Sequence, residues 1–379
     1  MLLGFTPSTM SVEWTGAGEI REVDWVRRRD FSWIVAGIVL GIGVDALDAD
    51  RLDALLPAGP TVSRTARIGA ADLEAIQEAT AVFRCSDFSH GGGICRPMVV
   101  AKLRSVLALR HASCTSVVRE RLMMATADLG KVAAWTSYDA ERHNDARRLW
   151  MIALSIAHQA EHPRSADLTA HLLMDMAHES LHLRQPQEAL SLVQLGYGTA
   201  ARRAQPLSAS TASHLASYQA WGQAALRDAR ACDRAVGQAI EHFTHVDPDT
   251  AAPWAAHITI AELAAMQGHA QYTLALATAN PKHAARAMPL LREAVEGFGP
   301  AYARPRAVNL PGLAGAHALT GDLGTAAHAG HRAVEEITAL ASPRAYDRLR
   351  ILGTVLQPHD TTPAISEVRG QIQAALVTA

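Results

Sequence analysis

Aromatic residues are scarce in this chain: 6 Phe, 7 Trp and 6 Tyr make up 5% of its 379 residues. Large β-sheets rely on aromatic and β-branched side chains, so this scarcity argues against a β fold. Ala and Leu, which both favour helices, are prominent among the 49% of residues that are apolar. Because the chain is too long for one compact core, we expect an all-α protein built as an extended array or as two domains.

The chain also lacks an excess of basic residues, since 35 Lys and Arg are set against 37 Asp and Glu. A domain that grips DNA or RNA usually carries a basic excess that neutralises phosphates. We therefore expect no direct nucleic-acid binding by this chain.

Cysteine is scarce as well. The four cysteines, at positions 85, 95, 114 and 232, form no C-x-x-C motif. Scattered cysteines in a chain of this length are typical of a reduced protein, so we expect a cytoplasmic location. Cys85, His90 and Cys95 match no zinc-site spacing, and we predict no metal or other cofactor.

Long hydrophobic runs are absent too. The apolar run 33–44 is too short to span a bilayer, so we expect no membrane insertion. Arg28 and Arg29 precede it as in a twin-arginine export signal, but no small-x-small cleavage site follows. We favour a short helix that docks on the rest of the chain. The predicted domains are residues 1–65, a linker with short docking helices, and residues 66–379, a helical-repeat domain.

A small–large–small pattern recurs along the second of these regions. It reads Ala146, Trp150, Ala153, then Ala189, Val193, Gly196, then Cys232, Val236, Ala239, with weaker copies at Ala284 and Ala326. The first positions are spaced by 43, 43, 52 and 42 residues. Twelve residues before the first three of them lie Ala134, Ala177 and Ala220. Small residues let helices approach closely, so each copy predicts one pair of packed helices.

This pattern is the second-helix signature of a tetratricopeptide repeat, although the period exceeds the usual length of roughly 34 residues. We predict a tetratricopeptide-like superhelix of about five degenerate helix pairs, with an insertion between Phe243 and Pro281. The first helix of each pair should line a concave groove.

Ten residues fall on the groove side in this register. They are Lys131, Trp135, Tyr138, Asp139, His171, Met174, His178, His182, His214 and Trp221. Aromatic and histidine side chains in a groove suit a peptide, protein or small-molecule ligand.

Two motifs suggest other chemistry. His178-Glu179-Ser180-Leu181-His182 is an H-E-x-x-H pattern, which with His171 would predict a zinc enzyme. It falls on a repeat helix beside Ala177, and nothing predicts the sheet of a zinc protease, so we expect no catalytic residues. Gly91-Gly92-Gly93 precedes a helix, where backbone amides can hold an anion, but no P-loop Lys follows. We interpret these glycines as an inter-helix loop that needs positive φ.

The block 73–103, LEAIQEATAVFRCSDFSHGGGICRPMVVAKL, closely resembles a block in actinobacterial regulators that join an Xre-type helix-turn-helix to a tetratricopeptide-like region. The resemblance continues through AAWTSYDAERHNDARRLWMIAL and MAHESLHLRQPQEALSL and covers about residues 66–350. The N-terminal DNA-binding domain of those regulators has no counterpart here, and MLLGFTPSTMSVEW resembles the linker that follows it.

The resemblance implies the ligand- or peptide-sensing and protein-interaction half of a transcriptional regulator. A homodimer is one form that such a protein can take. A protein–protein scaffold without a small ligand is the first alternative, and the zinc enzyme is the second.

Overall fold

The computed structural model describes residues 35, 39 and 67–378, and every regular element in this part is helical. Short 3₁₀ turns and one isolated bridge, Arg67 with Ser113, complete it. The α-helices are α3 (Ala70–His90), α4 (Gly92–Leu107), α5 (Ser116–Asp139), α6 (His143–Gln159), α7 (Ser165–His182), α8 (Pro186–Arg203), α9 (Ala209–Ala225), α10 (Ala229–Phe243), α11 (Ile260–Thr278), α12 (Pro281–Gly297), α13 (Ala303–Leu319), α14 (Leu323–Thr338), α15 (Ala345–Leu356) and α16 (Pro363–Thr378). The all-α prediction is confirmed for this part of the chain.

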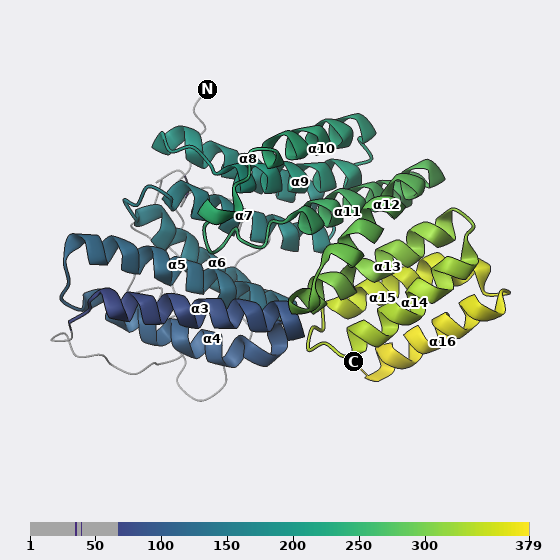
Figure 1. Cartoon of the computed structure of the whole chain (residues 1–379), viewed down its shortest axis with the longest axis horizontal. Helices are drawn as coiled ribbons and strands as arrows, with labels where there is room; N and C mark the ends of the chain where they lie inside the picture. Colours follow the sequence, from purple (N-terminus) through teal and green to yellow (C-terminus); the bar gives the residue numbers. More distant parts are fainter. Residues whose placement is uncertain (1–34, 36–38, 40–66, 379) are drawn as a thin grey trace, which may run out of the picture.

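Consecutive helices pack as pairs, and the turn inside a pair recurs along the chain (Figure 1). In five pairs, from α5/α6 to α13/α14, the first helix is followed by a residue with left-handed φ: Glu141, Arg184, Arg227, Ala279 and Gly321. In each turn the same local backbone hydrogen bond closes the helix end. It runs to the carbonyl five residues earlier from the N–H of Arg142, Gln185, Asp228, Asn280 and Asp322. These donors are 43, 43, 52 and 42 residues apart, the intervals that the small–large–small pattern shows.

The small residues of the pattern lie where helices cross. Ala134, Ala177 and Ala220 in the first helices are buried, as are Ala146, Ala189 and Cys232 in the second helices. Burial of such short side chains allows close helix–helix approach, since a longer one would fill the space the neighbouring helix occupies.

Local sequence also fixes where the helices begin. The Oγ of Thr115, Ser208 and Thr259 accepts a backbone N–H at the start of α5, α9 and α11. Asp228 and Asp322 cap α10 and α14 in the same way. Polar residues of this kind satisfy donors that the first helical turn leaves free.

The 52-residue interval contains the expected insertion. Residues 244–259 leave α10, form the 3₁₀ turn Pro248–Thr250 and reach α11. Trp254 anchors this segment, because its indole Nε1–H donates to Asp167 Oδ2 at 3.0 Å. The segment brings His257 next to His214, with ring centroids 5.6 Å apart.

The stack closes on itself. Figure 1 shows the start of α13 beside the end of α3, although more than 200 residues separate them in sequence. We call this contact the closure seam: residues 87–93 and Asp139 on one side, residues 301–304 and 341–344 on the other. The N–H of Ala341 donates to the carbonyl of His90 at 2.8 Å, and the N–H of Gly93 donates back to the carbonyl of Ala341 at 2.9 Å.

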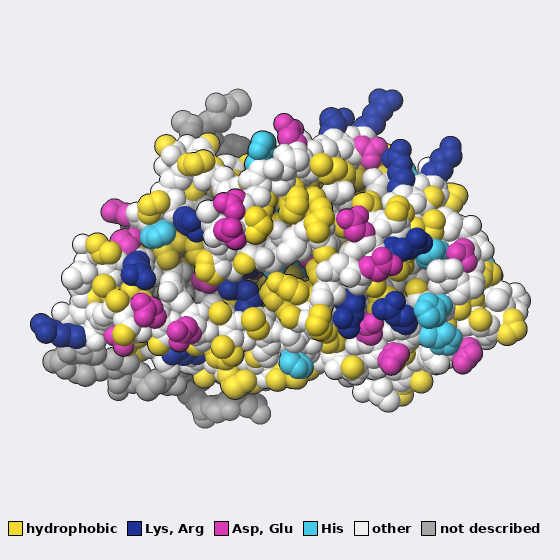
Figure 2. Space-filling model, viewed as in Figure 1, with side chains coloured by type: hydrophobic (Ala, Val, Ile, Leu, Met, Phe, Trp, Pro, Cys, Tyr) yellow, Lys and Arg dark blue, Asp and Glu magenta, His cyan; other side chains and the backbone are white. Residues whose placement is uncertain are grey.

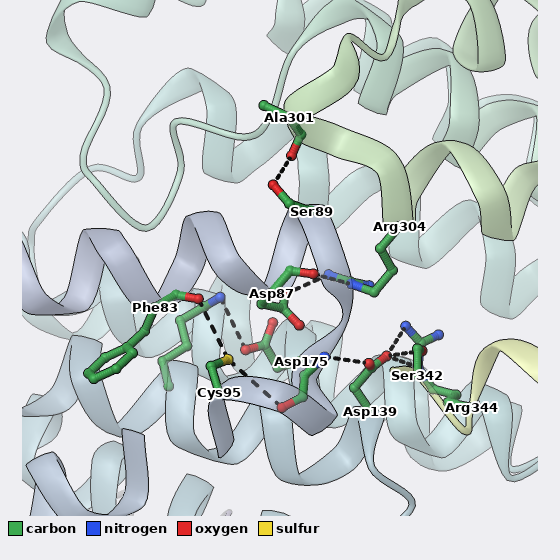
Figure 3. Close-up of polar contacts among 12 residues, drawn as sticks. Phe83, Asp87, Ser89, Cys95, Asp139, Asp175, Ala301, Arg304, Ser342 and Arg344 are labelled. Atoms are coloured by element: carbon green, nitrogen blue, oxygen red, sulfur yellow. Dashed lines mark hydrogen bonds and ion pairs between the residues drawn. The ribbon is translucent and has the colours of Figure 1, made fainter. Parts of the chain in front are cut away.

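Two ion pairs hold the closure seam (Figure 3). Arg304 donates through Nη2 to Asp87 Oδ2 at 2.7 Å, and Arg344 lies 3.1 Å from Asp139 Oδ1. Asp139 also accepts from Ser342 Oγ at 2.9 Å and from the N–H of Gly92 at 2.8 Å. All four charged side chains are at most 4% exposed, so the seam is a buried polar network.

The glycine block belongs to this seam. Gly91 has φ +91°, and a Cβ there would lie 2.7 Å from the carbonyl oxygen of Ala341. A Cβ on Gly93 would meet the same oxygen at 2.7 Å, and one on Gly92 would lie 2.8 Å from Thr136 Cα. The predicted inter-helix position with positive φ is therefore Gly91 alone, because Gly92 and Gly93 begin α4. All three positions are glycine where the backbones approach too closely for side chains.

Two features extend or lie beyond the predictions. The described chain has a helix pair before and one after the five that the pattern marks, α3/α4 and α15/α16, which lack its clear signature. Residues 1–65 lie outside the described residues, apart from Val35 and Val39, which are helical and buried. No helix of the described part is long and apolar enough to cross a membrane.

Candidate ligand-binding cavity

The interior of the closed stack holds a cavity with a volume of about 130 Å³. Its walls come from the first helix of every pair, α3, α5, α7, α9, α11, α13 and α15, together with the 244–259 insertion. Within residues 67–378, no second helix contributes a lining residue to it. The paired second helices lie behind the first ones.

A larger chamber of about 520 Å³ adjoins it at the carboxyl ends of α7, α9 and α11. The two chambers share Trp221, His269, Val308, Asn309, Arg344 and Arg348. These residues form a boundary layer between an inner and an outer chamber. Trp221 and His269 meet edge to face at 4.4 Å between ring centroids.

Several cationic side chains that line the inner chamber are paired with carboxylates, of which Asp175 and Asp87 also line it and Asp128 does not. Lys131 Nζ lies 3.1 Å from Asp175 Oδ2, and Arg84 lies 2.6 Å from Asp128 Oδ1. The seam pair Arg304–Asp87 lies on the same wall. In the outward view of Figure 2, basic and acidic side chains are also interspersed among apolar ones, without a large field of one sign.

Burial sets the protonation of several of these acids. It raises the pKa of Asp87 to about 6, although Arg304 works against this, and raises the pKa of Glu262 to about 7. Burial would also raise the pKa of Asp139, but Arg304, Arg344 and the N–H of Gly92 outweigh it and lower that pKa. Asp139 therefore stays ionised, whereas Glu262 is close to half protonated at neutral pH.

Histidines and aromatic rings fill the space between the charges. His178 Nδ1 lies 3.0 Å from Tyr218 Oη and its ring packs 5.2 Å from Trp135 and 5.1 Å from Trp221. His171 Nε2 lies 3.0 Å from Thr211 Oγ1. Burial lowers the pKa of His171, His178, His257 and His269 well below the usual range and that of His214 to about 3. The rings are therefore neutral at pH 7 and act as hydrogen-bonding apolar surface.

The structure brings most of the predicted groove residues to this cavity. Lys131, Trp135, His171, Met174, His178, His214 and Trp221 line the inner chamber, and His182 lines the outer one. Tyr138 and Asp139 line neither chamber, which corrects their placement in the groove. Tyr138 is fully buried among Trp150 and three histidine rings, and Asp139 belongs to the closure seam.

The H-E-x-x-H residues each have a separate partner. Glu179 is fully buried and accepts from Arg147 Nε at 2.8 Å, with His143 Nδ1 at 2.7 Å from its other oxygen. His182 Nε2 lies 2.7 Å from Asp347 Oδ2, and His178 lies against Tyr218. Within the described residues no cluster of three or more His, Cys, Asp or Glu side chains could hold a metal ion.

Cys85, His90 and Cys95 are likewise separate. Cys85 and His90 are exposed, while Cys95 is buried with its Sγ 3.8 Å from the carbonyl oxygens of Phe83 and Gly92. Burial raises the pKa of the Cys95 thiol to about 11, so it packs as a neutral side chain.

No family model, curated protein or solved structure matches this chain.

Sequence reasoning missed the wall that closes the cavity. Extending the register by the 52-residue interval from His214 reaches Met266, which lines the inner chamber together with Glu262 and His269 of the same helix. His257 lies in the insertion, where no period applies. Arg304, Arg344 and Arg348 face the cavity only because the last pairs fold back onto α3, and their local sequence gives no signal of this.

Proposed function

We propose that this chain is a regulatory sensing protein, a degenerate tetratricopeptide-like superhelix that binds a small molecule in its central cavity. The supporting observation is that the first helices of all seven described pairs converge on one cavity lined by buried charges, histidines and aromatic rings. Ligand sites are typically concave, mostly apolar and fitted with a few directed polar groups. The inner and outer chambers together match that description.

A small molecule fits this geometry better than an extended peptide. A peptide that ran along an open superhelical groove would cross the closure seam, where Arg304–Asp87 and Arg344–Asp139 are buried contacts. The outer chamber gives access to the inner one through the layer of Trp221, His269 and Arg348.

The same arginines give a route from ligand to signal. Arg304 and Arg344 line the cavity and also form the closure seam. A ligand that contacts either guanidinium competes with its seam carboxylate, which would alter how the last helix pairs sit on α3. Because each pair touches mainly its neighbours, a small rotation at the seam accumulates along the array and can change an outer surface that binds a partner protein.

We place this protein in the cytoplasm and assign it no catalytic or direct nucleic-acid-binding role. The support is the near-neutral charge, the scattered cysteines and the engagement of Glu179 by Arg147 rather than by a reacting group. A regulatory partner, including a second copy of the chain, would receive the signal.

The test is a ligand screen on the whole chain, with stabilisation against heat as the readout. A ligand at about 100 times its Kd stabilises the folded state by about 2.7 kcal/mol. We expect one or more small molecules to stabilise the wild-type protein and Tyr197→Ala, whose ring lies on α8 outside both chambers. Trp221→Ala should keep its helical circular dichroism and lose the shift. Equal binding by folded Trp221→Ala would contradict the cavity as the site.

A further inference from the structure

One cationic side chain of the cavity, Arg348, has no carboxylate partner among the described residues. Arg84, Lys131, Arg304 and Arg344 each have a carboxylate within 3.1 Å, namely Asp128, Asp175, Asp87 and Asp139. Arg348 lines both chambers and, among the described residues, forms no ion pair with a carboxylate. The neighbouring acid Asp347 is bonded to His182 and Arg350.

Neutral rings surround the Arg348 guanidinium. Nη1 lies 3.0 Å from His269 Nε2, and the guanidinium carbon lies 5.9 Å from the centre of the Trp221 ring. Burial and the neighbouring charge of Arg344 lower the pKa of Arg348 to about 10, so it remains a cation at neutral pH. Arg348 is only partly buried, but even a partly desolvated cation without a counter-charge is costly, and an anion that reaches it recovers part of that cost.

An acidic side chain at the opposite end of the cavity, Glu262, also has no hydrogen-bond or ion-pair partner among the described residues. The carboxyl of Glu262 forms no hydrogen bond or ion pair within the described part of the chain, although its backbone N–H is bonded to Thr259. Glu262 precedes His269 by seven residues on α11, which places the two about 10 Å apart along the helix axis. Arg348 contacts His269, so the free cation and the free acid lie at opposite ends of the aromatic lining.

We propose that the cavity binds a small organic acid with a flat apolar body, whose carboxylate pairs with Arg348 and whose far end offers a hydroxyl or amino group to Glu262. This inference rests on the proposed sensing function and names its ligand class. The indole rings of Trp135 and Trp221 and the neutral His178 ring provide flat contact surface between the two ends. One unpaired guanidinium matches one carboxylate in charge and fork geometry, whereas a phosphate dianion would keep one negative charge uncompensated.

The probe is 4-hydroxycinnamate, compared with its neutral amide and with cinnamate, which lacks the hydroxyl. Binding to the whole chain is measured by titration calorimetry. We expect the acid to bind at least about tenfold more tightly than the amide, because a hydrogen bond to a charged group is at stake. Cinnamate should bind more weakly than 4-hydroxycinnamate, and Glu262→Ala should remove that difference.

The decisive variant is Arg348→Gln, with Arg332→Gln as its matched control. Arg332 lies on α14 outside both chambers and pairs with Glu336. Arg332→Gln should keep the preference for the acid over the amide, and Arg348→Gln should bind the two equally. Arg348→Lys, which keeps the charge but loses the fork, should retain part of the preference. Circular dichroism and the melting temperature establish that each variant is folded.

Three results would overturn the inference: no binding of 4-hydroxycinnamate to the wild-type chain, equal binding of acid and amide, or an undiminished preference in folded Arg348→Gln. Equal binding of acid and amide that Trp221→Ala abolishes would leave the sensing function standing and remove only the ligand class. The ligand screen, which includes bases and neutral compounds, decides the sensing function separately.

Discussion

Asp139 and Arg344 form a buried ion pair across 205 residues of sequence, and the same arginine lines the central cavity. The Asp139 carboxylate also receives bonds from Ser342 Oγ and the N–H of Gly92. One side chain thus joins the end of α5, the start of α4 and the loop before α15. This network links the shape of the cavity to closure of the stack.

Removing one partner of that pair should destabilise the protein strongly. Asp139→Ala leaves Arg344 buried without its charge partner, and such losses cost about 3–5 kcal/mol. The measurement is the free energy of unfolding in urea. As a control, Arg286→Ala breaks the pair with Asp233, in which both side chains are about half exposed or more, and should cost at most about 1 kcal/mol. Similar costs for the two variants would show that the closure seam contributes little to stability.

The glycine block makes a second stability prediction. Gly91→Ala combines an unfavourable φ of +91° with a Cβ 2.7 Å from the carbonyl oxygen of Ala341. Gly321→Ala has a similar φ of +87° but open space around the new Cβ, so it isolates the backbone strain of about 1–2 kcal/mol. We expect Gly91→Ala to cost about 1–3 kcal/mol more than Gly321→Ala, by overpacking.

Gly324 in α14 is a control for the glycine-to-alanine change itself, because it has neither a positive φ nor a close neighbour. It has no close neighbour for a Cβ, so Gly324→Ala should leave the protein as stable or more stable by about 0.5–1 kcal/mol. Urea denaturation of all three variants tests the order. Equal costs at Gly91 and Gly321 would place the seam further apart than the structure has it.

Stability should fall as the pH is lowered from 7 to 5. Six cavity histidines have pKa values below that of an unfolded histidine, about 6.5, because burial disfavours their charged form: His171, His178, His182, His214, His257 and His269. The unfolded chain then binds more protons below pH 6.5, so each histidine favours unfolding on acidification, by up to about 1.4 kcal/mol per pH unit.

Three cavity acids act in the opposite sense, since burial raises the pKa of Asp175 as well as those of Asp87 and Glu262. Asp87, with a pKa of about 6, and Glu262, with a pKa of about 7, keep their protons in the folded state, which favours folding as pH falls toward their unfolded values. Six histidines outnumber three acids, so the net slope of stability against pH should be positive. Unfolding in urea at pH 5, 6 and 7 measures it. His257→Gln should flatten the slope and His111→Gln, at an exposed site, should leave it unchanged; a wild-type slope of zero or below would contradict this account.

Most of the residues that the register assigns to the groove line one of the two chambers, including His182 at the end of α7, but Tyr138 and Asp139 at the end of α5 do not. Trp135 and Tyr138 are three residues apart on α5, yet Trp135 lines the cavity and Tyr138 packs against Trp150 behind it. Asp139, the last residue of α5, was assigned to the groove by the same register and instead reaches the closure seam. The repeat spacing predicts which face of a helix is buried. It does not predict how the ends of neighbouring helices are placed relative to one another.

The sequence by itself determined the helix pairs, their intervals and their turns, because those depend on contacts within a pair and between adjacent pairs. Small residues such as Ala189 mark the crossings, and caps such as Asp322 mark the helix starts, both within a few residues of the features they control. Only the tertiary structure decided that the array closes. Asp87 meets Arg304 because small rotations between successive pairs add up over 217 residues, and no local pattern records that sum. The unpaired Arg348 and the acid Glu262 face one cavity for the same reason.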